Sequence, residues 1–433
     1  MQRALSYARM PAISVPLPFM LAAPCFGLAA ALLLVWHGDQ ALVSRWTPVT
    51  LGMTHLIALG FLTMTIVGAL FQLLPVTAGV AVPLARPVAA FCWCALGLGS
   101  ALLAAALGLG LGGAAFRVAA GLLGSAGFVF LSAIGAAIAG RVPAGAKALV
   151  EGIRYAAASL AITIAIGATL ALYLGGVGVV NAPLLTDIHA TWGLVGWVIV
   201  LTATVSFQVI PMFQGTATYP RLLETGLPPL LFVLLFGWSA ARLQDAAWWR
   251  LACEIGIAAL LLHYAVVTVH YLRRRKRKPD TGSRYWMLAM GSLLLAALLH
   301  FIPLELLLVD PAALPLLTGV LVIVGCAMSA VNGMLYKIVP FLVWYHLAHD
   351  DRLPRQRVPK LSAVLGEAQA ARQWRWHLAG LVLLALACVF PAVLARPAGL
   401  FLMVALLLLA RDMCGAALLY ARLRQPANLE RSC

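Results

Sequence analysis

Long apolar segments recur along this chain from one end to the other. A helix needs about 20 predominantly apolar residues to cross the hydrocarbon core of a bilayer, and runs of that length occur about twelve times. Of the 433 residues, 63% are hydrophobic and only 10% are charged. The sequence therefore predicts an all-α, polytopic membrane protein, folded as a single integral membrane domain over residues 1–433. The predicted spans are 15–37, 48–76, 87–111, 115–140, 152–176, 183–212, 227–243, 248–272, 284–305, 312–346, 376–395 and 397–421.

The basic residues are unevenly divided between the two sides of the predicted spans. If the spans alternate in direction, most of the 30 Lys and Arg residues fall on the side that holds both termini, including the run from Arg273 to Lys278. Cytoplasmic loops carry such an excess, which predicts cytoplasmic termini. Orientation and anionic lipid headgroups thus explain the net charge of +16. The expected partner is the lipid bilayer, and no nucleic acid is expected.

A short motif ends the second, sixth and tenth predicted spans. Its copies are FQLLP (71–75), FQVIP (207–211) and YKIVP (336–340). The same three spans also begin alike, with PVTLGMTH (48–55), PLLTDIH (183–189) and PLLTGVL (315–321). His55 and His189 end the first two of these, and Leu321 takes their place in the third. The spacing predicts three quasi-equivalent four-helix arcs, roughly residues 15–140, 152–272 and 284–421.

Twelve spans in three arcs, with His55 and His189 near the outer ends of the second and sixth, resemble subunit I of the haem-copper oxidase superfamily. That superfamily includes terminal oxidases and nitric oxide reductases. The resemblance implies that His55 is an axial ligand of a low-spin haem, because the second helix supplies one in this family. It also implies that His189 binds a non-haem metal such as copper, because the sixth helix supplies such a ligand.

The chain departs from this family in its other histidines, which makes it resemble a degenerate member. The family's tenth helix carries two histidines near its outer end, whereas residues 316–325 contain none. The paired histidines after the seventh helix are also missing from residues 239–249. We therefore expect no stand-alone proton-pumping oxygen reductase. The chain also resembles, more weakly, the NnrS family of haem- and copper-containing proteins linked to nitric oxide metabolism, although the His-rich signature of that family is not reproduced.

Four histidines within predicted spans are the candidate ligands of a haem or metal: His55, His189, His300 and His263. Ionisable groups inside a membrane are costly and mark functional sites. His55, His189 and His300 are expected at a similar depth near the outer side, where two of them could ligate one haem or another metal. His263 and His270 are seven residues apart on one helix face, a spacing that suits a second cofactor or a proton relay. The alternative for His55, His189 and His300 is a hydrogen bond to a carbonyl of a neighbouring helix, and the alternative for His270 is a position at the membrane interface beside the arginine run.

Four further polar residues are candidates for a proton pathway: Glu254, Lys337, Gln72 and Gln208. Glu254 is an acidic residue in an apolar stretch, and its alternative role is an ion pair with Arg250. Lys337 takes the glutamine position of the third motif, where it could also extend its amine to the membrane edge. Gln72 and Gln208 stand three residues before motif prolines, where an amide can cap carbonyls that proline leaves free or bind water.

These observations favour a haem-binding protein of the bacterial inner membrane that acts in respiratory electron transfer or nitric oxide-related chemistry. A CxxCH attachment motif is absent from the sequence, so the haem is expected to be non-covalent and of b type. Copper or another metal could bind in addition to the haem. A cytochrome or another redox subunit is the expected partner. The alternative is a transporter or channel in which intramembrane histidines bind substrate or protons.

Overall fold

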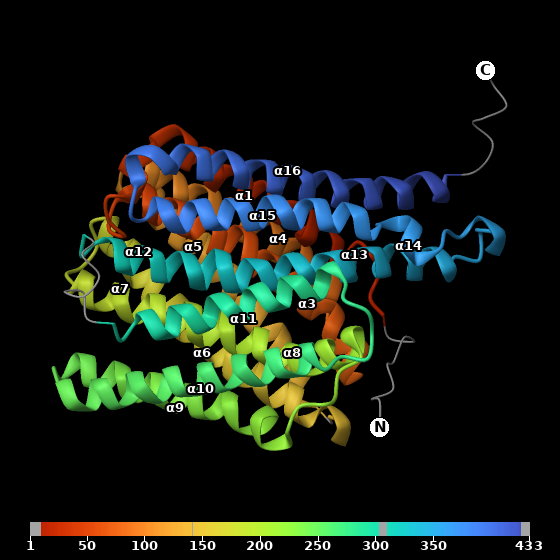
Figure 1. Ribbon diagram of the computed structural model, residues 1–433, viewed down its shortest axis with the longest axis horizontal. Helices are drawn as coiled ribbons and strands as arrows, with labels where there is room; N and C mark the ends of the chain where they lie inside the picture. Colours follow the sequence, from red (N-terminus) through yellow and green to blue (C-terminus); the bar gives the residue numbers. More distant parts are fainter. Residues whose placement is uncertain (1–9, 141, 303–309, 426–433) are drawn as a thin grey trace.

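A computed structural model describes residues 10–140, 142–302 and 310–425. Every long element within these ranges is a helix, and the helices run along the longest axis of the molecule (Figure 1). The first half of the chain forms α1 (Leu17–His37), η2 (Gly38–Leu42), α2 (Pro48–His55), η3 (Leu56–Thr63), α3 (Met64–Leu73), η4 (Leu74–Ala78), α4 (Ala85–Gly108), α5 (Gly113–Ala139), η5 (Ala144–Ala146), α6 (Lys147–Leu174), α7 (Ala182–Thr191), η6 (Trp192–Ile199) and α8 (Val200–Gln214). The second half forms α9 (Arg221–Leu243), α10 (Ala247–Arg273), α11 (Thr281–Leu299), α12 (Ala313–Val320), η8 (Leu321–Met328), α13 (Ser329–Ala348), η9 (Arg355–Arg357), α14 (Leu361–Val364), α15 (Glu367–Ala387) and α16 (Pro391–Arg424).

Eleven helical stretches in the described ranges are long and apolar enough to cross a membrane. This confirms the prediction of an all-α polytopic membrane protein. The predicted eleventh span, 376–395, is misplaced, because α15 covers Glu367–Ala387 and α16 already begins at Pro391. The first turns of α15 contain the charged residues Glu367, Arg372 and Arg375, so the apolar run in the sequence begins later than the helix does. The end of the predicted ninth span, 303–305, lies outside the described residues.

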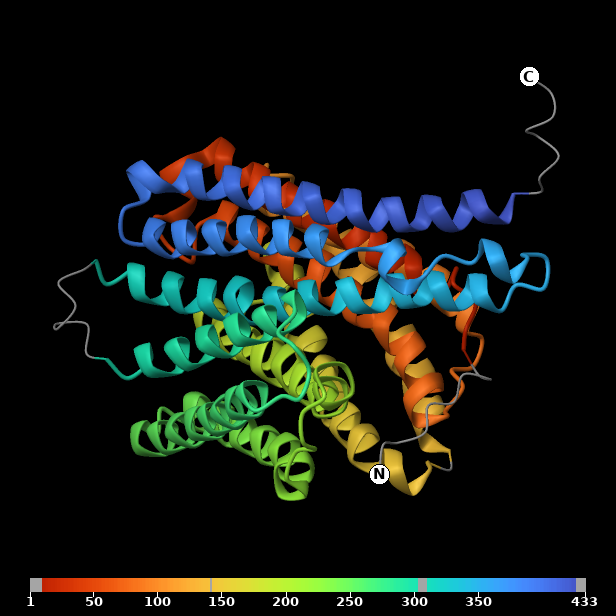
Figure 2. The ribbon, with the colours of Figure 1, turned by 45° about the vertical axis from the view of Figure 1, so that its right-hand side comes forward.

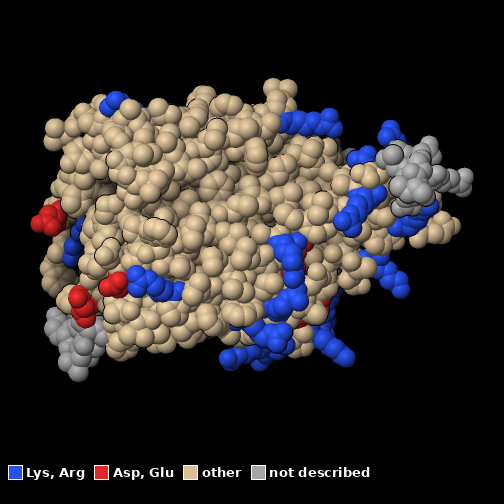
Figure 3. Space-filling model, turned by 90° about the horizontal axis from the view of Figure 1, so that it is seen from above, with Lys and Arg blue, Asp and Glu red and all other residues tan. Residues whose placement is uncertain are grey.

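The two ends of the bundle differ in charge. We call the end at which α2, α7 and α12 begin the outer end, and the opposite end the inner end. On the face seen in Figure 3, Lys and Arg side chains gather at the inner end, and the surface between the ends is almost free of charge. Helix α1 begins and α16 finishes at this inner end (Figure 1).

Two ion pairs at the inner end each join a loop residue to a helix. Asp280 caps α11 and accepts a hydrogen bond from Lys337 Nζ at 2.7 Å. Asp350, which follows α13, lies 2.7 Å from Arg424 at the end of α16. Both pairs join a loop residue to a helix from another part of the chain, so they fix how the loops at this end sit on the bundle.

Capping residues start two of the motif helices at the outer end. Thr47 accepts the backbone N–H of Thr50, and Asn181 accepts that of Leu184. A proline follows each cap in the first helical turn, where its missing N–H costs no hydrogen bond. The sequence similarity among the starts of these spans therefore reflects a shared way of beginning a helix.

The three motif spans form the centre of the bundle. In their most apolar stretches 67%, 72% and 61% of residues are buried, against at most 56% in the other spans. Each contains a π-helical segment, η3, η6 or η8, and η8 contacts both of the others. The segments begin 19 residues before Pro75, Pro211 and Pro340 in turn. This common register supports the threefold repeat.

A glycine occupies the same position in every π-helical segment. Gly60, Gly196 and Gly325 each stand 15 residues before the motif proline. A Cβ on these glycines would lie 2.3 Å from Phe26, 2.8 Å from Ser159 and 2.5 Å from Ser292, which are residues of α1, α6 and α11. Small residues allow helices to approach closely in membranes. In each unit, therefore, the first helix packs against the glycine of the second.

The remaining helices surround this centre. Helix α4 packs on α5, α9 packs on α10, and α15 lies beside α16 in both ribbon views (Figures 1 and 2). Large exposed side chains such as Phe128, Leu222 and Val393 lie on the outside of the bundle, as expected for surfaces in contact with lipid. The fold thus places the motif spans away from lipid and close to one another.

Candidate functional site

His55 and His189 lie at the same distance from the outer ends of their helices. Each stands seven residues after the first residue of α2 or α7, about 10 Å along the helix axis. A π-helical segment begins directly after His55 and three residues after His189. Such segments are frequent at functional sites.

The two imidazole rings lie side by side, one from α2 of the first unit and one from α7 of the second. Their centroids lie 6.2 Å apart and their planes differ by 19°. His55 Nδ1 is 2.8 Å from Leu51 O, and His189 Nδ1 is 3.0 Å from Thr163 O. A carbonyl only accepts, so both Nδ1 atoms carry the proton and donate it. The Nε2 atom of each ring is then left with its lone pair and has no hydrogen-bond partner among the described residues.

A glycine makes room for His189. A Cβ on Gly167 would lie 2.7 Å from His189 Cε1, which is too close for any side chain. Gly167 stands one turn after Thr163 on α6, so the imidazole can approach the Thr163 carbonyl only because this position has no side chain. The sequence analysis did not identify Gly167, because its role depends on a contact between helices.

The two histidines are not equivalent in the repeat, although their depth is the same. His55 stands 20 residues before Pro75, and His189 stands 22 residues before Pro211. In the register set by the π-helical segments, Thr191 corresponds to His55 and Met53 corresponds to His189. The repeat therefore brings the two helices together, and each histidine reaches the other from its own position.

A cavity of about 670 Å³ opens beside this pair at the outer end. We call it the outer cavity. Its deep wall is apolar and includes Ile57, Leu194 and Val324, and its mouth carries charged groups. The cavity lies on other faces of the helices that hold His55 and His189, and its lining includes Thr54 and Ala190 from positions next to them.

Two ionic clusters line the mouth of the outer cavity. Asp187 accepts hydrogen bonds from Arg45 at 2.8 Å and from Arg242 at 2.6 Å, and it stands two residues before His189. These contacts join α7 to α9 and to the loop before α2.

Glu254 is the centre of the second cluster. It accepts the indole N–H of Trp238 at 3.0 Å and lies 3.7 Å from both Arg250 and His300. The structure thus brings together the two candidates Glu254 and His300, and it places His300 away from the paired rings of His55 and His189. The ion pair with Arg250, the alternative role for Glu254, is also present.

Comparisons with known proteins add no family. No protein-family model matches this chain, and no curated protein matches its sequence.

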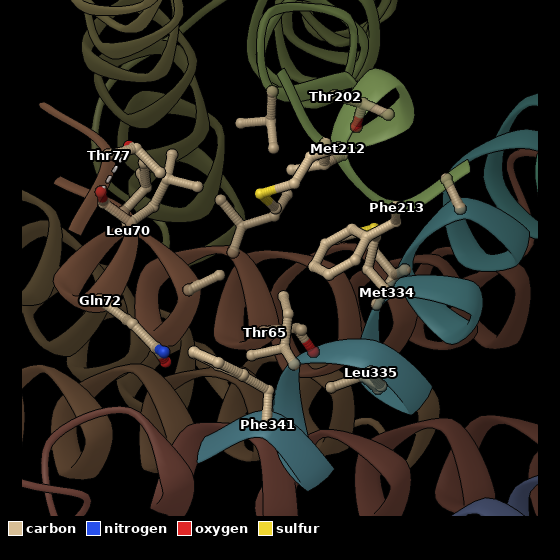
Figure 4. Close-up of a pocket in the computed structure, with 18 of the residues that line it drawn as sticks. Thr65, Leu70, Gln72, Thr77, Thr202, Met212, Phe213, Met334, Leu335 and Phe341 are labelled. Carbon is tan, nitrogen blue, oxygen red and sulfur yellow. Dashed lines mark hydrogen bonds between the residues drawn. The ribbon is translucent and has the colours of Figure 1, made fainter. Parts of the chain in front are cut away.

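A second cavity, of about 440 Å³, lies at the inner end between α3, α8 and α13. We call it the inner cavity. Its lining is mostly apolar, with side chains such as Met212, Phe213 and Phe341, and Gln72 reaches it from α3 (Figure 4). Gln72 is buried, and its Oε1 has no hydrogen-bond partner among the described residues. No hydrogen bond from the Gln72 amide to a backbone carbonyl is found among the described residues, and its role in a proton pathway stays a prediction.

The other candidates are dispersed. Gln208 is half-buried on α8, and Lys337 pairs with Asp280 at the inner end. His263 is exposed on α10, and no ring contact joins it to His55 or His189 in the described part of the chain. Among those residues no group of three or more His, Cys, Asp or Glu side chains could hold a metal ion. The candidates therefore form one histidine pair and a cluster at the outer cavity.

The sequence analysis missed His377. The predicted eleventh span, 376–395, placed it at a span end, but it is 1% exposed, with Ser329 and Asn332 of α13 beside its ring. Its placement followed from the misplaced eleventh span. A start for this helix at Glu367 would have put His377 three turns inside it.

Proposed function

We propose that this chain is a haem-binding membrane protein in which His55 and His189 would hold one non-covalent haem of b type. The observation that carries the proposal is the pair of nearly parallel imidazoles 6.2 Å apart, each held through Nδ1 by a backbone carbonyl. Histidines that ligate a metal commonly donate the other ring N–H to a carbonyl or carboxylate. The neutral rings of this pair each keep one nitrogen for a metal.

The separation of the rings is compatible with a metal between them. Metal–nitrogen bonds to imidazole are about 2 Å long, and two such bonds plus the adjoining parts of both rings fit within 6.2 Å. A haem supplies the other ligands of its iron, so two imidazoles are sufficient, whereas zinc sites usually take three or four protein ligands. A single copper ion is the other metal that an imidazole pair suits.

A haem held by both histidines would supply one-electron transfer and would not bind oxygen or nitric oxide. We therefore favour a role in respiratory electron transfer over nitric oxide-related chemistry, with a cytochrome or another redox subunit as the partner. We place the chain in a bacterial inner membrane with both termini cytoplasmic, because its basic residues gather at the inner end (Figure 3).

The optical spectrum of the purified protein tests this proposal. We expect a Soret band in protein expressed with an adequate supply of haem, and we expect His55→Ala and His189→Ala each to abolish or shift it. His263→Ala is the matched control, because this histidine is exposed on α10 and its loss should leave the spectrum unchanged. A wild-type protein without haem, or a normal spectrum in both variants, would contradict the proposal. Copper found in place of iron would assign the pair to copper.

The two cavities favour the alternative of a transporter or channel. Both are lined by the three motif spans. The outer cavity lies beside the π-helical segments and toward the outer end, and the inner cavity lies on the inner side of these segments. Carriers commonly place substrate near the membrane midplane between repeats. Uptake of a solute by reconstituted protein that contains no haem would move this alternative ahead.

A further inference from the structure

A group of buried polar side chains lies between α11, α13, α15 and α16 in the third unit. None is more than 8% exposed. Buried polar groups within a membrane are expensive and mark functional sites or pathways. The group consists of Tyr285, Ser329, Asn332, Tyr336, Gln373, His377 and Asp412.

The inner arm of this group begins at Asp412. Its side chain is fully buried, yet it lies 2.6 Å from the guanidinium of Arg411, whose side chain is 55% exposed. Tyr336 donates its hydroxyl to the other Asp412 oxygen at 2.9 Å. Arg411 thus connects a buried carboxylate to the surface of the protein.

The outer arm begins at His377. His377 Nε2 lies 2.8 Å from Ser329 Oγ, and Ser329 Oγ lies 3.3 Å from the carbonyl of Val324 in η8. Because the carbonyl only accepts, the serine hydroxyl donates to Val324 and accepts the proton of His377 Nε2. Val324 lines the outer cavity, so this arm ends at the cavity wall.

Two amides occupy the gap between the arms. The Tyr285 hydroxyl donates to Gln373 Oε1, and Asn332 Nδ2 lies 3.4 Å from His377 Nδ1. Asn332 Oδ1 and Gln373 Nε2 are both buried without a partner among the described residues. An unpaired acceptor and an unpaired donor in one buried group are the partners that an internal water requires.

The route continues beyond the outer arm to the opposite surface. The outer cavity extends from Val324 to its mouth, where Glu254 and His300 line it. The His300 side chain is 49% exposed. Polar groups and a cavity therefore connect the side of Arg411 to the side of His300.

We propose that this group is a proton relay between the inner surface and the outer cavity, with one bound water between Gln373 and Asn332. Asp412, which is fully buried, takes a proton from water that enters beside the exposed guanidinium of Arg411, and it passes one to Tyr336 as that hydroxyl releases its own proton to the bound water. The bound water then passes a proton to His377 Nδ1, from which the Asn332 amide turns aside, and His377 releases the proton on Nε2 to Ser329. The Ser329 hydroxyl turns from the Val324 carbonyl and releases its own proton to water in the outer cavity. Each group ends with the number of protons it began with, so the net change is one proton moved. His377 is left as its Nδ1–H tautomer, and it must return to the Nε2–H tautomer before the next transfer. The proposal does not depend on haem.

Proton flux into liposomes tests the relay. Purified full-length protein is reconstituted around a trapped pH-sensitive dye, valinomycin and potassium balance the charge, and the external pH is stepped. We expect wild-type liposomes to equilibrate faster than protein-free ones. Tyr336→Phe and His377→Gln should each lower the protein-dependent rate on the order of tenfold or more, because positioned proton-transfer groups contribute at least that much to rates.

Matched controls separate a relay from a structural role. Tyr420→Phe removes a hydroxyl from the same helix as Asp412 but from a residue bonded to Arg424, and His349→Gln removes an exposed imidazole at the end of α13. Both should conduct like wild type. Tyr336→Phe removes one oxygen without changing shape, so it keeps the test valid if His377→Gln does not fold. Wild-type flux equal to that of protein-free liposomes, or unchanged flux in Tyr336→Phe, would overturn the relay. Neither result bears on the Soret band.

Discussion

The indole N–H of Trp197 donates to the hydroxyl of Thr63 across 3.1 Å. Both side chains are buried, and the bond joins η6 of the second unit to η3 of the first. The outer cavity reaches Ile57 and Val195 on these spans, and the inner cavity begins at Thr65 and Leu201. The bond therefore lies in the layer that separates the two cavities.

Breaking this bond should cost a modest amount of stability. Hydrogen bonds between helices in membranes contribute about 0.6 kcal/mol on average and at most about 1.7 kcal/mol. We expect a coupling energy in this range from a double-mutant cycle of Trp197→Phe and Thr63→Val, measured by unfolding in detergent. A coupling energy of zero would show that the two groups do not stabilise one another.

Alanine at the glycines of the π-helical segments should destabilise the bundle. Gly60→Ala places a methyl group 2.3 Å from Phe26, and Gly325→Ala places one 2.5 Å from Ser292. Overpacking of this kind costs about 1–3 kcal/mol, which should lower the thermal unfolding temperature. Gly121→Ala is the control, because nothing lies within 4 Å of its Cβ position. Equal stability of all three variants would argue against the close helix contacts.

Gly167→Ala should disturb the proposed haem without altering a ligand. The added methyl group would lie 2.7 Å from His189 Cε1, so the ring must turn away from Thr163. We expect a shifted Soret band or a reduced haem content, measured against Gly121→Ala as an open-space control. An unchanged spectrum would indicate that His189 is not a ligand or that α6 moves to accommodate the methyl group, and the haem content of His189→Ala separates these two explanations.

Neutralising Asp187 should weaken the outer end more than neutralising a surface carboxylate. Asp187 accepts charge-assisted bonds from Arg45 and Arg242 and its side chain is 22% exposed, so Asp187→Asn should cost about 1–3 kcal/mol. Glu151→Gln breaks an exposed pair with Arg154 and should cost less than about 1 kcal/mol. Urea or thermal unfolding of both variants in detergent measures the difference. Equal losses would mean that the Asp187 bonds act as ordinary surface contacts.

Stability should depend on the ionisation of Asp280 in acid. Burial alone would raise the pKa of Asp280, but the hydrogen bond and charge of Lys337 and the N–H of Ser283 outweigh it and hold the pKa below its ordinary value of 3.8. A lowered pKa stabilises the folded state above the unfolded value and loses that effect as pH falls through the folded value. Asp280→Asn should therefore be less stable than wild type near neutral pH.

The difference between Asp280→Asn and wild type should shrink as pH falls below about 4. Thermal unfolding measured from neutral pH down to that range gives the comparison. Lys337→Met removes the partner of the ion pair and should flatten the same pH dependence. A difference that persists unchanged in acid would point to the helix cap of α11, and not the charge, as the source of the stability.

The spans and the motif could be predicted from sequence because they depend on local composition. Apolar runs mark most of the spans, and FQLLP, FQVIP and YKIVP mark the repeat. The eleventh span was misplaced because α15 begins with charged residues, and their low hydropathy is typical of a loop. The π-helical segments could not be predicted from sequence. The only feature that marks them locally is a glycine at the same position of each segment, which is Gly60, Gly196 or Gly325.

The candidate site could be predicted only in part. Sequence identified His55 and His189 as polar groups at equal depth, but the distance between their rings depends on how the second and sixth spans pack. The same limit applies to Asp187 with its two arginines and to the group around His377. These contacts join residues far apart in the chain, and no spacing within one helix encodes them.

The glycine contacts also bear on how the protein is made. Gly60 packs on Phe26, Gly196 on Ser159 and Gly325 on Ser292, so each contact joins two consecutive spans. Local contacts form early in folding, and these helix pairs can dock as soon as the ribosome has delivered the second member to the bilayer. His55 gains its counterpart only after the whole first unit and the start of the second have been inserted. Any cofactor held between the two rings therefore has to enter after translation has passed the sixth span.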